Sequence, residues 1–286
     1  MTTLPLGIVT MFRNEGPYLV EWIEYHLLAG VSQFWLYDNG STDDGPRRLQ
    51  PYIARGVVEL TPWPTTDNPP RRRERITRQL DAAKDGFRQA RGKVEWVAHV
   101  DVDEFILPMQ DHDVPTCLKK HFSEASGVYV NWRMFGTSGI SIPLGNPILP
   151  SLTSCAVREH SENSVGKSVV RPECVDLEAI WYVHHFPLQS GFYLDGGKNR
   201  LSFNARNDLV KNNSSFDEYI RINHYNLRDE HFYQTRRLPD AAQGRLDKKL
   251  DRLVQHHEDF NKDRDKKIIK YLKYEHPSVY RERWDK

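Results

Sequence analysis

One stretch decides the fold of this chain: Trp96-Val97-Ala98-His99-Val100-Asp101-Val102-Asp103-Glu104-Phe105. A mostly apolar run ends there in two aspartates, and a third acid follows directly. If the run is a strand, alternate side chains share one face. Asp101 and Asp103 then project together from its carboxyl end, while Val100 and Val102 pack on the other side. In open α/β sheets, ligands bind at that edge.

Two carboxylates held this close repel each other unless a cation neutralises them. Mg²⁺ or Mn²⁺ does so with oxygen ligands and usually also holds substrate phosphates. An acidic loop that caps the next element is the alternative reading of an Asp-x-Asp pair. The apolar run in front of the pair favours the metal site.

The composition places the chain among globular proteins. It has 286 residues, of which 38% are hydrophobic and 28% charged, enough for a core and one large α/β domain with or without an extension. The net charge of +1 does not indicate a nucleic-acid binder. Cys117, Cys155 and Cys174 are too widely spaced for a zinc or disulfide pattern, which favours a reduced compartment. Without a signal peptide or a long apolar run, we expect a soluble, cytoplasmic protein with no transmembrane segment.

Strand and helix patterns alternate on the amino-terminal side of the aspartates. The expected strands are residues 6–11, 34–37 and 57–60, and another follows at 128–132. Helical spacing runs from Pro17 towards Gly30 and again over residues 76–90. This order predicts a mainly parallel sheet with helices on both faces. Residues 136–200 read as active-site loops. A charged helical extension with Leu246, Leu250, Leu253 and Val254 on one seam begins near residue 228.

Several motifs together resemble glycosyltransferase family 92 and its relatives among family 2-like enzymes. The resemblance covers roughly residues 6–230 and rests on these stretches in order: Arg13-Asn14-Glu15, Glu21-Trp22-Ile23-Glu24-Tyr25-His26, Tyr37-Asp38-Asn39-Gly40-Ser41-Thr42-Asp43, Asp101-Val102-Asp103-Glu104-Phe105, Asn131-Trp132-Arg133-Met134-Phe135-Gly136-Thr137-Ser138-Gly139, Lys167-Ser168-Val169-Val170-Arg171-Pro172 and Ile222-Asn223-His224-Tyr225.

The resemblance implies a GT-A (Rossmann-like) glycosyltransferase domain over residues 1–227. Its nucleotide half spans about 1–107 and its acceptor half about 108–227, and residues 228–286 form the helical carboxyl-terminal extension, where peripheral membrane contact stays open. The implied reaction is metal-dependent and inverting. It moves galactose, xylose, glucose or rhamnose from a UDP-sugar to a hydroxyl of a glycan or glycoconjugate acceptor.

The resemblance also implies site residues. The nucleoside maps to the set Thr10, Arg13, Asn14, Glu15 and Asp38, in which Asp38 accepts from uracil N3–H. Asp101 contacts ribose or the donor sugar and joins the metal site. Asp103 binds Mn²⁺ or Mg²⁺ directly, and His224 completes the coordination, with His184 and His185 as rivals. A local salt bridge with a helix cap is the alternative for Arg13 and Glu15, and an Asx turn for Asp38.

The remaining predicted roles concern the diphosphate, the acceptor and the catalytic base. Lys167 and Arg171 would pair with the departing diphosphate. Trp132, Phe135 and His184 would contact the acceptor, although core packing is the alternative for the two aromatic residues. Inversion needs a carboxylate base, for which Glu159 is predicted, with Glu162, Asp176 and Asp195 behind it. Relatives tend to carry a glutamate where this chain has Pro150 and Ser151.

Two other functions compete with glycosyl transfer. A nucleotidyltransferase or phosphotransferase on a similar sheet would need a Gly-rich phosphate loop after the first strand, and Arg13-Asn14-Glu15 is not one. A non-catalytic nucleotide-sugar-binding relative would keep the fold without the chemistry. The presence of Asp101, Asp103 and His224 together argues against that second alternative.

Overall fold

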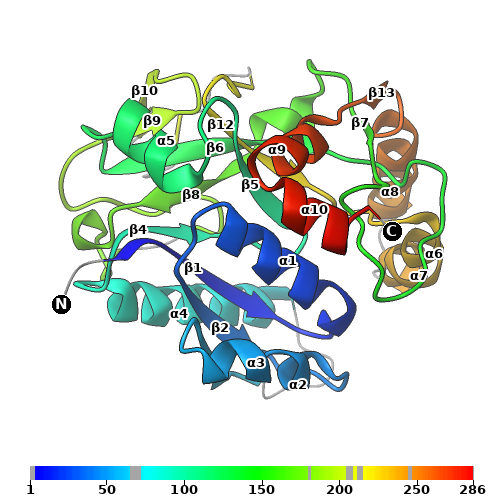
Figure 1. Cartoon of the computed structure of the whole chain (residues 1–286), viewed down its shortest axis with the longest axis horizontal. Coiled ribbons are helices and arrows are strands. Elements are labelled where there is room, and N and C mark those ends of the chain that lie inside the picture. Colours follow the sequence, from blue (N-terminus) through cyan, green and yellow to red (C-terminus); the bar gives the residue numbers. More distant parts are fainter. Residues whose placement is uncertain are drawn as a thin grey trace.

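The computed structural model describes residues 4–64, 72–179, 182–203, 209–210, 215–243 and 247–285. Figure 1 shows their arrangement. The helices are α1 (Gly16–Leu28), α2 (Gly45–Arg48), α3 (Gln50–Ala54), α4 (Arg72–Ala90), α5 (Val114–His121), η1 (Ser161–Ser164), η2 (Pro172–Cys174), α6 (Glu230–Phe232), the π-helix η3 (Tyr233–Arg237), α7 (Leu238–Gln243), α8 (Asp247–Asp259), α9 (Lys267–Glu275) and α10 (Pro277–Arg283). None of these helices is both long and apolar enough to cross a bilayer.

The strands form one large sheet and one small ladder. They are β1 (Leu4–Phe12), β2 (Gln33–Asp38), β3 (Val58–Pro62), β4 (Val94–His99), β5 (Glu104–Pro108), β6 (Gly127–Met134), β7 (Ser154–Cys155), β8 (Gly166–Val170), β9 (Tyr193–Asp195), β10 (Arg200–Phe203), β11 (Leu209–Val210), β12 (Ile220–His224) and β13 (Asp263–Arg264). The main path of the large sheet runs β11-β10-β9-β6-β8-β4-β1-β2-β3.

The amino-terminal half of the sheet is parallel and carries helices on both faces, as predicted. β1 pairs in parallel with β2 and β4, and β3 pairs in parallel with β2. Leu6 and Ile8 share a buried cluster with Trp22 of α1. Val9 points to the other face and packs with Phe87 of α4. The alternation of side chains along β1 therefore buries both faces of the strand, which explains its nearly continuous apolar sequence.

Beyond β4 the sheet becomes mixed. β8 lies antiparallel between β4 and β6, and β9 returns parallel to β6. β12 pairs antiparallel with β5 and parallel with β6, so a strand from late in the chain lies beside the segment that follows the aspartates. The predicted α/β, Rossmann-like class with a helical carboxyl-terminal extension is confirmed. The sheet was predicted to be mainly parallel, and it is so from β4 to β3, whereas the remainder is mixed.

The aspartate pair lies in a turn and not on a strand. β4 ends at His99, and the Glu104 N–H donates to the Asp101 carbonyl at 3.0 Å before β5 begins. Val100 and Val102 are nevertheless buried in one cluster. The turn therefore anchors its valines in the core and leaves its acids at the sheet edge. The alternation along a strand predicted the same separation of valines and acids, but a turn produces it.

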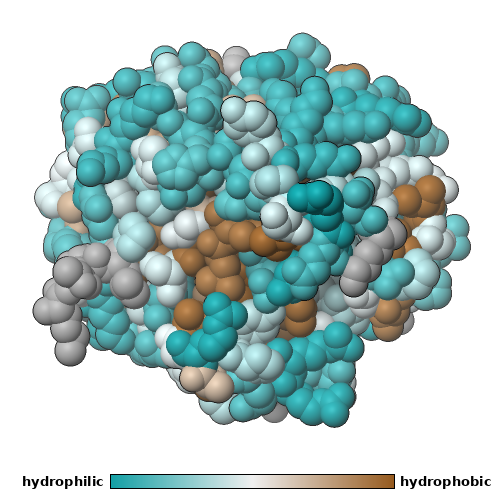
Figure 2. Space-filling model, viewed as in Figure 1, coloured by the Kyte–Doolittle hydropathy of each residue, from teal (hydrophilic) through white to brown (hydrophobic). Residues whose placement is uncertain are grey.

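The carboxyl-terminal segment is more than a charged extension. Phe260, Leu272 and Trp284 are buried in the same cluster as the main sheet. β13 pairs with β7, and the Arg221 guanidinium binds the Asp265 carboxylate through two bonds of 2.8 and 2.9 Å. The charged face lies outside, and an apolar face completes the core. Figure 2 shows one face of the molecule, which is mostly hydrophilic with an apolar area over α1 and smaller apolar areas near α6–α8.

A buried histidine makes this fold sensitive to acid. His26 bonds through Nδ1 to the Trp22 carbonyl at 2.8 Å, and its Nε2 accepts from the Ile106 N–H at 3.3 Å. Only a neutral ring can donate at one nitrogen and accept at the other. Burial lowers the pKa of His26 to about 3. The unfolded chain therefore binds more protons between about pH 6.5 and pH 3, and stability is lost as the pH falls through that window.

We expect the free energy of unfolding to fall by about 2 kcal/mol between pH 7 and pH 5 from His26 alone, since one pKa unit corresponds to about 1.4 kcal/mol. Urea denaturation at pH 7, 6 and 5 measures the loss. In His26→Phe, the free energy of unfolding should depend less on pH, because the contribution of this residue is removed. An unchanged slope in the variant would assign the acid sensitivity elsewhere, first to His99, whose pKa burial also lowers to about 3.

Candidate functional site

The carboxyl ends of β1, β4 and β12 meet around one cavity of about 340 Å³. The loops after β1 and β4 supply most of its wall, and residues from the end of β12 onward close it. Its lining residues are Met11, Phe12, Arg13, Glu15, Asp101, Val102, Asp103, His224, Asn226 and Arg237. Because parallel strands end at the same edge, acids far apart in the sequence converge there.

Lys167 neutralises the first acid of the motif. Its ammonium nitrogen lies 2.9 Å from Asp101 Oδ2 and 3.7 Å from Glu104 Oε2. Lys167 and Glu104 are buried, so the cation is held between two carboxylates away from water. Burial raises the pKa of Asp101, but the charge and hydrogen bond of Lys167 together with His99 lower it, and the net shift is downward. The other Asp101 oxygen accepts from the Gln79 amide at 3.3 Å, so this carboxylate is already hydrogen-bonded on both sides.

Asp103 faces His224. The distance from His224 Nε2 to Asp103 Oδ1 is 3.6 Å, and from His224 Nε2 to Glu104 Oε1 it is 4.0 Å. Burial lowers the pKa of His224, but the nearby Asp103 carboxylate outweighs this and raises it overall. Burial likewise raises the pKa of Asp103, but His224, Arg228 and Arg237 together lower it, and the net shift is downward. Each member of the pair therefore favours the charged form of the other when no metal is bound.

This pair suits a divalent ion. Carboxylate oxygen and imidazole nitrogen are both ligands of Mn²⁺, and such ions commonly take one or two carboxylates together with substrate phosphates. The Glu104 Oε1 atom is also buried without a hydrogen bond and faces the same histidine. Within the described ranges, no group of three or more His, Cys, Asp or Glu side chains is placed to hold a metal ion.

The loop after β1 is fixed from both ends of the chain. Asn14 has a left-handed backbone with φ 55°, and its side-chain oxygen accepts from the Thr42 N–H at 2.7 Å. Glu15 accepts from Arg228 Nη2 at 2.9 Å, and the Arg228 guanidinium stacks 3.8 Å above the Tyr18 ring. Burial raises the pKa of Glu15 to about 7 even though Arg228 opposes the shift.

Two predicted donor-binding residues have local structural roles. Thr10 is fully buried, and its hydroxyl donates to the Val100 carbonyl, which ties β1 to the aspartate turn. Asp38 ends β2 and accepts from the Ser41 N–H at 2.8 Å. That bond is an Asx turn, the alternative considered for this residue, and it leaves the second carboxylate oxygen available for a ligand.

The structure does not bring Arg171 or Glu159 to this edge. Arg171 lies four residues beyond Lys167, about 13 Å along the strand, and binds Glu95 at 2.9 Å near the amino end of β4. Glu159 is exposed. Its neighbour Arg158 pairs with Asp217 at 2.6 Å, beside the end of β12 that lies away from His224.

The three predicted acceptor contacts differ in their surroundings. Phe135 is fully buried, with its ring centroid 4.5 Å from that of Tyr225, so it packs in the core. Trp132 lies between two histidines, with ring centroids 4.4 Å from His224 and 5.3 Å from His184. His184 bonds through Nδ1 to the Gly166 carbonyl at 2.9 Å. Trp132 and His184 therefore neighbour the metal-binding candidate, and Phe135 does not reach a ligand.

Sequence reasoning missed Asn226 and Arg237, which line this cavity, and Arg228, which binds the lining residue Glu15. All follow His224 closely, yet they fell at the boundary where the charged segment begins. The buried side-chain oxygen of Asn226 has no hydrogen-bond partner among the described residues, and one terminal nitrogen of Arg228 also lacks one. The positive φ of Arg228, 56°, sets its guanidinium against Tyr18. No local pattern signals this arrangement, because the tertiary fold creates it.

Comparison with solved structures gives weak similarity to sugar-nucleotide enzymes. S. aureus TarS 1-349 in complex with UDP-GlcNAc matches at 15% identity and a TM-score of 0.37, covering 60% of this chain and 46% of that chain. Glucosyl-3-phosphoglycerate synthase from Mycobacterium tuberculosis, solved with Mn²⁺, UDP and glucosyl-3-phosphoglycerate, matches at 18% identity and a TM-score of 0.31, covering 60% of this chain and 58% of that one.

Comparison of sequences is more informative. A glycosyltransferase family 92 protein of Ricinus communis is 31% identical over 206 residues, covering 69% of this chain and 34% of its own length. One of Oryza sativa subsp. japonica is 29% identical over 209 residues, with 69% and 32% covered. This chain thus spans about a third of the length of these relatives. The model of glycosyltransferase family 92 matches residues 8–273. The chain therefore belongs to glycosyltransferase family 92.

Proposed function

We propose that this protein transfers a sugar from a UDP-sugar to a hydroxyl of a glycan or glycoconjugate acceptor. The observation that carries the proposal is the convergence of Asp101, Asp103 and His224 on one cavity at the sheet edge, beside the loop that holds Glu15. Family membership supports a glycosyltransferase, and the relatives named for UDP-GlcNAc or UDP bind those molecules in their own structures.

In this proposal Asp103 and His224 hold Mn²⁺ or Mg²⁺, which when bound acts as a Lewis acid on the diphosphate oxygens. Lys167 keeps Asp101 ionised, so its carboxylate accepts hydrogen bonds from ribose or sugar hydroxyls. Arg13 and Arg237 line the same cavity and supply positive charge opposite the acids. Family resemblance favours a single displacement with inversion at the anomeric carbon.

A screen of nucleotide-sugar hydrolysis and transfer, with Mn²⁺ and without, tests the proposal. We expect turnover with UDP-sugars, dependent on added metal and removed by chelation. Calorimetry should show UDP bound more tightly than GDP. Failure to bind any nucleoside diphosphate in the presence of Mn²⁺ would contradict the proposal that this cavity is a donor site.

Asp38 should contribute to uracil recognition. A hydrogen bond to a charged acceptor contributes about 1.5–3 kcal/mol, so Asp38→Ala should weaken UDP by roughly tenfold or more. Asp38→Asn is the matched control, because its side-chain oxygen still accepts from the Ser41 N–H and keeps the turn. If both variants bind UDP like the wild type, Asp38 serves the turn alone.

A further inference from the structure

We propose that a second cavity, next to the proposed donor pocket, binds the anionic, apolar part of the acceptor, a phosphate-bearing amphiphile. The cavity measures about 440 Å³, within the range of small-molecule sites. The role of this ligand as an acceptor rests on the proposed transferase function. The binding of such an amphiphile is independent of that function, and it can be measured without catalysis.

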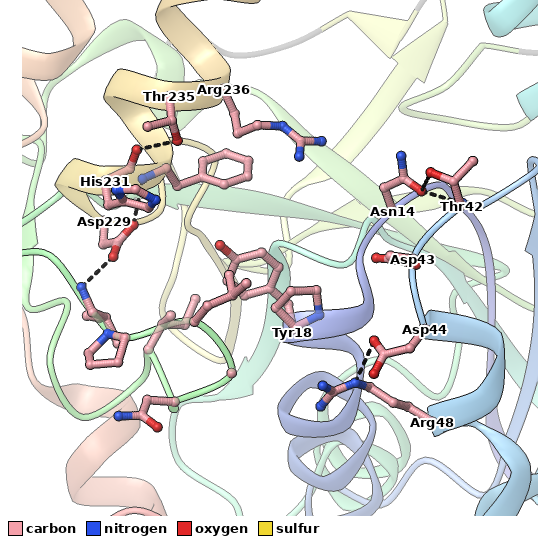
Figure 3. A pocket seen from close by; sticks show the side chains of 18 residues that line it. Asn14, Tyr18, Thr42, Asp43, Asp44, Arg48, Asp229, His231, Thr235 and Arg236 are labelled. Carbon is pink, nitrogen blue, oxygen red and sulfur yellow. Dashed lines mark hydrogen bonds and ion pairs between the residues drawn. The ribbon is translucent and has the colours of Figure 1, made fainter.

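The cavity lies between α1 with its neighbour α2 and the helical segment α6–η3 (Figure 3). The loop 142–148 supplies an apolar wall together with Tyr18 and Phe232. Leu144 in that loop is 76% exposed, an unusual position for a leucine in water. An apolar ligand segment lying on this wall would shield it from water, which stabilises the complex.

The acids that line the cavity are already satisfied within the protein. Asp43 accepts from the Gly16 N–H at 2.8 Å and the Gly45 N–H at 3.0 Å. Asp44 pairs with Arg48 at 2.9 Å and Arg47 at 3.5 Å.

Asp229 completes the set of acids. Its two oxygens accept from the backbone N–H groups of Phe232 and Ile142. Each carboxylate oxygen of Asp43, Asp44 and Asp229 therefore has a donor. The acids stabilise the walls, and part of their hydrogen-bonding capacity is already used within the protein.

Several donors among the lining residues have no partner in the described part of the chain. Arg236 has no ion pair or hydrogen bond within the described residues, and Figure 3 shows its side chain extending from η3 towards Asn14. The Tyr18 hydroxyl likewise makes no hydrogen bond within the part of the chain that the structure describes. The Asn14 amide nitrogen is also unused, because only its oxygen binds Thr42. A guanidinium, a phenol hydroxyl and an amide nitrogen on one cavity suit a phosphate group, which accepts hydrogen bonds and carries negative charge.

The position of the cavity links it to the donor. Asn14 lines this cavity, and its neighbours Arg13 and Glu15 line the donor pocket, so one loop forms a wall of both. Likewise, Arg236 lines this cavity and its neighbour Arg237 lines the donor pocket. The π-helical turn of η3 carries both arginines, and π-helical turns occur frequently at functional sites. An acceptor held by Arg236 would thus have its reactive end beside the donor pocket.

The test measures binding by calorimetry with dodecyl phosphate below its critical micelle concentration. Dodecyl maltoside carries the same tail on a neutral head, and inorganic phosphate carries the head without the tail. We expect dodecyl phosphate to bind most tightly. Arg236→Gln and Leu144→Asp should each weaken it by about tenfold or more, while UDP affinity with Mn²⁺ stays as in the wild type.

Two variants serve as matched controls. Arg281→Gln removes an exposed arginine from α10, and Val254→Asp places an acid at another exposed apolar position, on α8. Both should bind dodecyl phosphate normally. Equal binding of dodecyl maltoside, no binding of dodecyl phosphate, or displacement of dodecyl phosphate by UDP would each overturn the proposal. Intact UDP binding in those cases would leave the proposed transferase function standing.

A transfer assay tests the acceptor role. With a sugar linked to dodecyl phosphate as acceptor, Arg236→Gln should lower kcat/KM by about tenfold or more. With the dodecyl glycoside of the same sugar, the variant should match the wild type. The same loss with both acceptors, or no loss with either, contradicts a role for Arg236 in holding the phosphate.

Discussion

Asp103→Asn should reduce metal-dependent sugar transfer by roughly 100- to 1000-fold, the loss seen when one group that stabilises developing charge is removed. The substitution keeps the size of the side chain and removes the charge that faces His224 at 3.6 Å. The screen with Mn²⁺ that identifies the donor provides the assay. Saturating Mn²⁺ should not restore turnover.

The same variant has a stability signature. Repulsion between Asp101 and Asp103 alone would predict a protein that is stabilised by the substitution. The structure argues otherwise, because Lys167 neutralises Asp101 and His224 is the partner of Asp103. We therefore expect a lower Tm for metal-free Asp103→Asn than for the wild type. Asp85→Asn is the control. Asp85 lies in α4 and accepts from the Tyr37 hydroxyl, away from the proposed metal site, so this variant should retain transfer. Wild-type turnover in Asp103→Asn would end the metal-site assignment.

Lys167→Met should lower the free energy of unfolding at pH 7 by about 3–5 kcal/mol, the usual cost of removing one partner from a buried ion pair. The side chain of Lys167 is only 3% exposed, and that of Glu104 is fully buried. Methionine fills a similar volume but leaves two carboxylates without their cation. Urea denaturation gives the difference directly.

The pH dependence distinguishes this loss from poor packing. Burial already raises the pKa of Glu104 to about 7, with Lys167 opposing. Without Lys167 the folded protein holds a proton on Glu104 more tightly than the unfolded chain does. Stability of the variant, relative to the wild type, should then recover as the pH falls from 8 towards 5. Adding Glu104→Gln should restore part of the loss at pH 7. A deficit that is independent of pH and unaffected by Glu104→Gln would indicate a packing defect.

The sequence predicts the parallel half of this fold well, because local signals and tertiary structure agree there. The first strand, the helix after Pro17 and the strand that leads to Asp101 all combine a clear period with a turn or cap. β8 carries no such signal. Its short run from Gly166 to Val170 lies antiparallel between β4 and β6, and only pairing with strands formed elsewhere fixes its direction.

The same limit applies to the site. Asp101, Asp103 and His224 could be predicted because each lies in a recognisable motif, and the structure brings them together. Lys167 and Arg171 are two cations of one family motif, but the rise along β8 separates them. Phe135 continues a family motif and yet faces the core. Arg236 and Arg237 are two charges among many in their segment, and only the helix η3 assigns them to different cavities.

The bond between Glu15 and Arg228 also sets the order in which the molecule can mature. Ribosomal synthesis proceeds from the amino terminus, and these two residues are 213 positions apart. The loop after β1 emerges early, but the arginine that fixes it and the histidine that faces Asp103 emerge only after three quarters of the chain. Contacts this distant in sequence form slowly. A nascent chain therefore holds its acids without their late partners, and the proposed donor pocket is complete only after β12 and Arg228 have been synthesised.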